Sequence, residues 1–163
     1  MIRSYFGIER APFDTKDIRL LPQQQEVLDT LRVHCQQGGL CLIVGEPGTG
    51  KSVLKQALID CEPKRLIAPA IARTLHTYLN TLRILCEAFA IDFDGCAFKC
   101  ERRLIEEAFR INRQGKMIAP VIDDAHLMDV QSLRKLRLLF GDFPKNHNLV
   151  LVAQPSLVRT LAL

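Results

Sequence analysis

One run of eight residues, 45–52, constrains this chain more than any other because it fits the spacing G-x-x-x-x-G-K-[ST] of a phosphate-binding loop. The run consists of Gly45, Glu46, Pro47, Gly48, Thr49, Gly50, Lys51 and Ser52. Residues 40–44 before it are apolar and suit a buried parallel strand, and residues 53–58 after it begin a helical pattern. A Gly/Pro-rich turn with a chance lysine is the alternative, but such a turn would not need this order of strand, loop and helix. The order predicts that the chain binds a nucleoside triphosphate.

The residue types in this loop match the chemistry of phosphate binding. Glycine at positions 45, 48 and 50 allows positive φ angles, so that successive backbone N–H groups can close on an anion. The helix that follows directs its positive end at the same phosphates. We expect Lys51 to reach the β- and γ-phosphates and Ser52 to place its hydroxyl on Mg²⁺.

A phosphate-binding loop predicts a partner, an acidic residue at the tip of a neighbouring apolar strand, and residues 117–124 supply it. Asp123 is the candidate Mg²⁺ partner, acting through water because Mg²⁺ gives up its hydration reluctantly. Asp124 stands where an ATPase places the carboxylate that orients and deprotonates the attacking water. The alternative is that the two aspartates cap a helix that begins near Leu127. Pro120 predicts a bulge or a short strand, because a central strand needs its N–H groups.

Composition agrees with one compact domain, since the 163 residues are 48% hydrophobic and 25% charged. The net charge of +4 permits an anionic partner without requiring one. No apolar run reaches membrane-spanning length and the first residues do not resemble a signal peptide, so we expect no membrane span and a cytoplasmic location. The six cysteines lack paired C-x-x-C spacing and are expected to be buried free thiols; a zinc site at Cys86, Cys96 and Cys100 is the alternative.

Apolar strands alternate with helical patterns along the chain, which predicts a parallel sheet with helices on both faces and ligands at the carboxyl ends of the strands. Helices are expected at about 23–37, 53–60, 74 or 77 to 89, 99–114 and 131–140, and strands at about 40–44, 66–70, 117–122 and 149–153. Residues 1–22 form an irregular lead-in segment with apolar anchors.

Five segments along the chain carry a resemblance to a known family. They are Tyr5–Ile8 with Pro12–Phe13, Gly45–Ser52, Asp123–His126, Leu133–Arg137 and Leu151–Leu157. Together they resemble the ExeA-type (general secretion pathway protein A-like) AAA+ ATPases and the related TniB/MuB-like transposition ATPases. The resemblance covers nearly the whole chain.

The resemblance implies a P-loop NTPase fold of the AAA+ type, an α/β domain over residues 1–163. It implies that residues 45–52 are the Walker A motif, that Asp123 and Asp124 are the Walker B motif, and that Gln154 is the sensor 1 residue near the γ-phosphate or the attacking water. The lead-in, residues 1–22, would help to enclose the adenine, unless its aromatic residues only plug the edge of the sheet.

Two departures from the family pattern affect what we expect of catalysis. Asp124 stands where the family usually has Glu, and a base about one ångström farther from the water can cost about a hundredfold in rate. The arginine finger, the fifth strand and the lid would lie beyond Leu163, which would leave the strand before the loop at an open sheet edge. We therefore expect this chain alone to hydrolyse ATP weakly or not at all, and to form a homo-oligomer only in a full-length form.

Basic residues mark the helices expected at 99–114 and 131–140, interspersed with glutamates on the first. Mixed-sign charge is usual on a solvated face, and contact with DNA phosphates is the alternative. The function favoured by the sequence is an ATP- and Mg²⁺-binding accessory ATPase for DNA transposition, with DNA and a transposase or other recombination protein as partners. The alternatives are an ATPase that energises assembly of a type II secretion machine, and a nucleotide-binding interaction module that hydrolyses little or nothing.

Overall fold

A four-stranded parallel sheet with the strand order β1-β6-β5-β3 forms the centre of the computed structural model, which describes residues 20–61, 66–67, 70–71 and 77–161. Its strands are β1 (Gly39–Val44), β6 (Asn148–Ala153), β5 (Val121–Ile122) and β3 (Ala70–Ile71). A parallel pair, β2 (Leu66–Ile67) with β4 (Met117–Ile118), precedes β3 and β5 in the chain. The predicted parallel α/β architecture is therefore confirmed.

Pro120 interrupts the strand that leads to Asp123. A proline has no N–H to donate, so the expected strand at 117–122 is split into β4 and β5. The carbonyl of Pro120 still accepts a hydrogen bond from Val150 N at 3.0 Å, which keeps this segment beside β6. The predicted short strand at this position is confirmed, and the described residues of the strand expected at 66–70 belong to β2 and β3.

The five helices expected from the sequence are all present, with small shifts at their ends. They are α2 (Pro22–Gln37), α3 (Lys51–Cys61), α4 (Tyr78–Ala88), α5 (Ala97–Arg113) and α6 (Val130–Gly141). Thr77 caps α4 by accepting a hydrogen bond from Asn80 N at 3.4 Å, whereas Thr74, the other candidate cap, lies outside the described residues. Two short elements were not predicted, the 3₁₀ helix η1 (Ala125–Leu127) and the helix α7 (Ser156–Leu161). In the described part of the chain no helix has the length and apolar character needed to cross a membrane.

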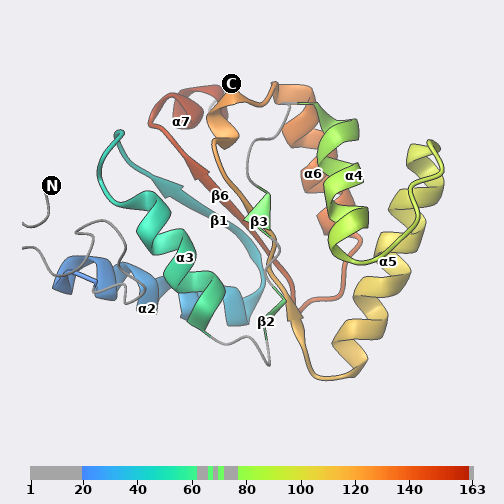
Figure 1. The fold of residues 1–163 in the computed structure, drawn as a ribbon, viewed down its shortest axis with the longest axis horizontal. Helices are drawn as coiled ribbons and strands as arrows, with labels where there is room; N and C mark the ends of the chain where they lie inside the picture. Colours follow the sequence, from blue (N-terminus) through green and yellow to red (C-terminus); the bar gives the residue numbers. More distant parts are fainter. Residues whose placement is uncertain (1–19, 62–65, 68–69, 72–76, 162–163) are drawn as a thin grey trace, which may run out of the picture.

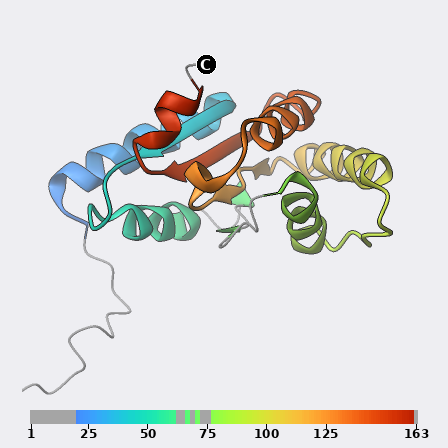
Figure 2. The same cartoon turned by 90° about the horizontal axis from the view of Figure 1, so that it is seen from above.

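Helices cover both faces of the sheet, and β6 shows this most directly because all six of its residues are buried. One core cluster contains buried side chains of α4, α5 and α6 together with Leu149, Leu151 and Ala153 of β6. Val150 and Val152 point to the opposite face and belong to the cluster that includes α2 and α3. Figures 1 and 2 show the same separation, with α2 and α3 beside one part of the sheet and α4 and α5 beside the other.

β1 lies at the edge of this sheet, since among the described strands it pairs only with β6. Its burial is accordingly lower than that of β6, and Leu40 is 51% exposed. The expected position of this strand at an open edge is confirmed for the described residues.

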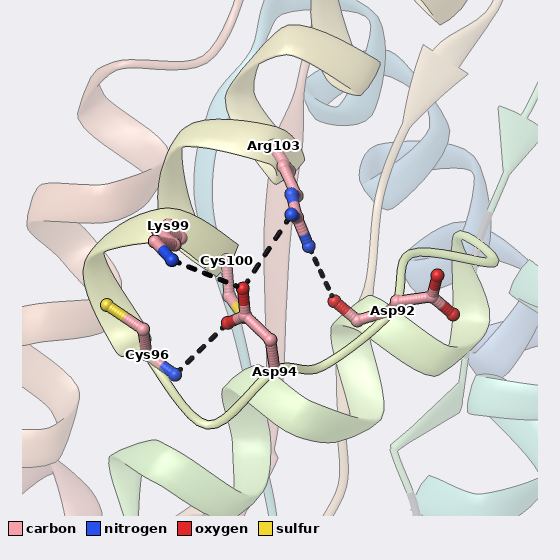
Figure 3. Close-up of polar contacts among 6 residues, drawn as sticks. All are labelled: Asp92, Asp94, Cys96, Lys99, Cys100 and Arg103. Carbon is pink, nitrogen blue, oxygen red and sulfur yellow. Dashed lines mark hydrogen bonds and ion pairs between the residues drawn. The ribbon is translucent and has the colours of Figure 1, made fainter.

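The start of α5 is organised by Asp94 (Figure 3). Its Oδ1 accepts a hydrogen bond from Cys96 N at 3.2 Å, and its Oδ2 lies 3.8 Å from Lys99 Nζ and 3.7 Å from Arg103 Nη2. Arg103 Nη1 also donates to the carbonyl of Asp92 at 3.1 Å, which closes the loop onto the helix. The Cys96 N–H lowers the pKa of the Asp94 carboxyl below its usual range, and the charges of Lys99 and Arg103 act in the same direction.

Replacing Asp94 with alanine removes the hydrogen bond from Cys96 N and both ion pairs, so we expect the thermal midpoint at pH 7 to fall by about 2–4 °C. Asp94→Asn keeps an oxygen that can accept the Cys96 N–H, so its thermal midpoint should fall by less than that of Asp94→Ala. Because the folded-state pKa lies below the usual 3.8, the stabilisation is present above that pH and is lost as the pH falls through the folded-state pKa. The difference between parent and Asp94→Ala should therefore shrink on acidification, as measured by circular dichroism melts. An equal difference at neutral and strongly acid pH would contradict this assignment.

Candidate functional site

The loop between β1 and α3 leaves the sheet at the carboxyl ends of the strands. Gly45 N donates to the carbonyl of Ala153 at 3.2 Å, which ties the start of the loop to the end of β6. Gly48 and Gly50 have φ angles of 83° and 84°, a conformation that side chains other than glycine rarely adopt. A Cβ at position 50 would also lie 2.4 Å from Gln24 Nε2. The glycine at position 50 thus permits the loop backbone, whereas the flexible end of the Gln24 side chain could move away from a Cβ.

Lys51 begins α3, and its side chain turns back across the loop. Its Nζ donates to the carbonyls of Gly45 and Glu46, each at 2.7 Å. Thr49 Oγ1 donates to the same Glu46 carbonyl at 2.8 Å, so the loop is closed around the ammonium group. Lys51 and Ser52 are the first two residues of α3, and N–H groups in a first turn have no acceptor within their own helix. These donors and the positive charge form a concentrated site for an anion.

Asp123 follows β5 directly and is fixed by three contacts. Its N donates to the carbonyl of Ile71 at 3.1 Å, which continues the pairing with β3. Its Oδ1 accepts from Asp124 N at 2.9 Å, and its Oδ2 accepts from Lys55 Nζ at 2.5 Å. The Lys55 and Asp123 side chains are only 16% and 19% exposed. This ion pair places the carboxylate one helical turn along α3 from Lys51.

Asp124 adopts the left-handed conformation, with φ 51° and ψ 34°, and its side chain is exposed. Among non-glycine residues this conformation favours short polar side chains such as Asp and Asn. Asp124 precedes η1, but its side chain accepts no capping hydrogen bond there. The longer helix α6 is capped by Asp129, whose Oδ1 accepts from Ser132 N at 2.8 Å and whose pKa is lowered by the Ser132 hydroxyl. Helix capping therefore does not explain the two aspartates.

Gln154 follows β6 at the same edge of the sheet. Its N lies 3.4 Å from His126 Nδ1, and its carbonyl accepts from Leu157 N at 3.1 Å in the first turn of α7. His126 thus joins the segment after Asp124 to the residue expected to be sensor 1. Figure 1 shows that the loop after β1 and the ends of β5 and β6 meet at one edge of the sheet.

Lys55 and Gln24 are neighbours of the site that were not predicted from the sequence. Lys55 offers one local signal, because a charged residue interrupts the apolar pattern of the helix one turn after Lys51. Its partner Asp123 lies 68 residues further along the chain, so no local pattern reveals the pair. Gln24 gives no such signal, since it lies in a run of glutamines on α2.

Two further expectations concern the lead-in and the cysteines. The aromatic residues of the lead-in, Tyr5, Phe6 and Phe13, lie outside the described residues. Cys86 and Cys100 are buried and Cys96 is exposed, and the part of the chain that the structure describes holds no group of three or more metal-binding side chains. Burial, with the neighbouring Cys100, raises the pKa of the Cys86 thiol to about 12, as expected for an inert core cysteine. The zinc alternative is therefore not supported.

Comparison with known proteins gives one family match and several related structures. Residues 32–161 match the family described as AAA domain. The chain is 29% identical over 171 residues to general secretion pathway protein A of Aeromonas hydrophila. The aligned region covers 99% of this chain and 31% of that protein.

Two solved structures share the fold at low sequence identity. Cdc6p from Pyrobaculum aerophilum has a TM-score of 0.64 and 18% identity, over 96% of this chain and 44% of that one. The ORC2 protein of Aeropyrum pernix, in its ADPNP-ADP complexes, has a TM-score of 0.61 and 14% identity, over 98% of this chain and 46% of that one. These likenesses confirm the predicted P-loop NTPase fold, and the family match over residues 32–161 shows that the chain belongs to the AAA domain family.

Proposed function

We propose that this domain binds ATP together with Mg²⁺ and hydrolyses it slowly in the full-length protein. The observation that carries the proposal is the meeting, at one sheet edge, of the glycine loop closed around Lys51 and the carboxylate of Asp123. The donor set fits the ligand, because N–H groups and an ammonium suit phosphate oxygens. Hydroxyl and carboxylate oxygens, here Ser52 and Asp123, suit Mg²⁺.

Each residue has a distinct part in this proposal. Residues 45–52 wrap the phosphates with backbone N–H groups, and Lys51 moves from the loop carbonyls to phosphate oxygens. Ser52 and Asp123 hold Mg²⁺, which when bound neutralises charge on those oxygens. Asp124 orients a water molecule and accepts its proton, and Gln154 contacts the same water or the γ-phosphate. The exposed position of Asp124 leaves its carboxylate accessible to water.

The extent of the domain and its assembly remain predictions. They include the span of residues 1–163, the role of the lead-in at residues 1–22, homo-oligomerisation of a full-length form, and a cytoplasmic location. The alternative of a module that binds ATP without hydrolysing it is separated from the proposed function by phosphate release from the full-length protein.

For the cellular role, a relative favours secretion over transposition. The similarity to general secretion pathway protein A extends over 99% of this chain, although the chain spans only 31% of that protein. We therefore propose, as the second level of function, that ATP turnover here energises assembly of a type II secretion machine. The predicted relation to TniB/MuB-like ATPases and the predicted role in transposition gain no support from these comparisons.

The basic residues of α5 point in the same direction. Arg102 Nε pairs with Glu106 Oε1 at 3.0 Å, and Arg110 Nη2 pairs with Glu107 Oε1 at 2.5 Å. Arg103 pairs with Asp94. Because these charges are compensated by acidic side chains on α5 or in the loop before it, they favour a solvated face over a DNA-binding surface. DNA and a transposase remain predicted partners, and ATP-dependent retardation of duplex DNA in a gel would support them against the secretion role.

Lys51→Ala should lower the affinity for a fluorescent ATP analogue by about 10-fold to 100-fold, the value of a hydrogen bond to a charged group. Titration by fluorescence anisotropy measures this. Lys99→Ala is the matched control, since it removes the same charge from a side chain that is 63% exposed and paired with Asp94. Unchanged affinity in Lys51→Ala would exclude the loop as the phosphate site.

The two aspartates should separate binding from turnover. Asp124→Asn keeps a side chain that tolerates the left-handed backbone, so fold and ATP affinity should stay within about twofold of the parent while phosphate release is lost. Asp123→Ala should instead make ATP affinity insensitive to Mg²⁺. The test uses full-length protein in which phosphate release is lost in Lys51→Ala, so that the measured release comes from this site. Phosphate release by Asp124→Asn at the parental rate would then rule out Asp124 as the base.

A further inference from the structure

The ion pair between Lys55 and Asp123 has no part in the residue roles proposed for ATP binding and hydrolysis. Lys55 Nζ lies 2.5 Å from Asp123 Oδ2, across the gap between α3 and the end of β5. Both side chains are less than a fifth exposed, at 16% and 19%, so solvent and salt screen their attraction less than they screen a surface pair.

Both oxygens of the Asp123 carboxylate have protein donors. Oδ1 accepts from Asp124 N at 2.9 Å, and Oδ2 accepts from Lys55 Nζ. A carboxylate can accept further contacts, so the position is not sterically closed to a metal. Its negative charge, however, is already compensated by an ammonium group, and charge is the main reason why a carboxylate attracts Mg²⁺.

We propose, on the basis of the proposed ATP-binding function, that Lys55 is a positioning residue that serves as a built-in counter-cation for Asp123 and competes there with Mg²⁺. In the absence of Mg²⁺, Lys55 holds the carboxylate in place and cancels its repulsion of the ATP phosphates. In the presence of Mg²⁺, the attraction between the metal and Asp123 is weaker than the attraction between the metal and a free carboxylate would be. ATP binding by this chain therefore depends less on Mg²⁺ than it would if the Asp123 carboxylate had no counter-cation.

Lys55→Met tests this because methionine has a similar length and no charge. The variant leaves Asp123 with an uncompensated charge, which weakens ATP binding without Mg²⁺ and strengthens it with Mg²⁺. The ratio of the two affinities should rise by about tenfold over the parent, within the usual range of coupling between two ligands. Affinities are measured with the fluorescent ATP analogue in excess Mg²⁺ and in EDTA.

Three comparisons separate this role from a purely structural one. Lys55→Arg keeps the charge and should retain the parental ratio. In the background of Asp123→Asn, adding Lys55→Met should leave the ratio unchanged, because the effect acts through the Asp123 charge. Lys99→Met, which breaks an exposed contact to Asp94 at 3.8 Å, is the control for removal of a lysine away from the site.

A raised ratio in Lys55→Met that disappears in the Asp123→Asn background supports the inference. Affinities equal to those of the parent in both conditions overturn it and show that Lys55 only ties α3 to β5. Equal loss of affinity with and without Mg²⁺, as expected for Lys51→Ala, also overturns it and makes Lys55 a phosphate ligand. If the parent binds no ATP in either condition, the proposed function fails, and the inference fails with it.

Discussion

The backbone pairing of β6 with β1 on one side and β5 on the other is the constraint on which the whole site depends. The register places Val44 opposite Ala153 and Ile122 opposite Leu151, so the segments that follow these strands leave the sheet at one edge. The first of these segments is the glycine loop, and the second carries Asp123. Parallel pairing brings together groups that are far apart in the chain, without any direct attraction between the loop and the acidic segment.

Burial on both faces maintains this pairing. Every residue of β6 is buried, with alternate side chains in the two core clusters, so a shift of one residue in register would exchange the contents of both faces. The interruption at Pro120 is tolerated because its carbonyl continues to pair with Val150 even though its nitrogen cannot. The site therefore rests on a strand that is buried along its whole length.

The sequence predicts the local parts of this arrangement well and the non-local parts poorly. The loop at residues 45–52 is recognisable because its spacing, its glycines and its flanking patterns all lie within one segment. Pro120 is likewise a local signal, because a proline within an apolar strand pattern predicts an interruption of that strand. By contrast, η1 and α7 are too short to produce a helical period, and the left-handed backbone of Asp124 has no signature in a single sequence. The pair of Lys55 with Asp123 is set by how α3 packs beside β5, which only the tertiary structure reveals.

The left-handed backbone at Asp124 also limits which residues can replace it as the sequence drifts. Glycine and asparagine fit this conformation readily, but neither can accept a proton from water. Glutamate keeps the carboxylate, but a longer side chain at a positive φ costs of the order of 1 kcal/mol in backbone strain. If Asp124 is the base, as proposed, the substitutions that suit this backbone remove the proton acceptor, and the substitution that keeps a carboxylate strains the backbone. The proposed phosphate-binding loop at residues 45–52 is a separate segment, so loss of the carboxylate would leave its residues unchanged.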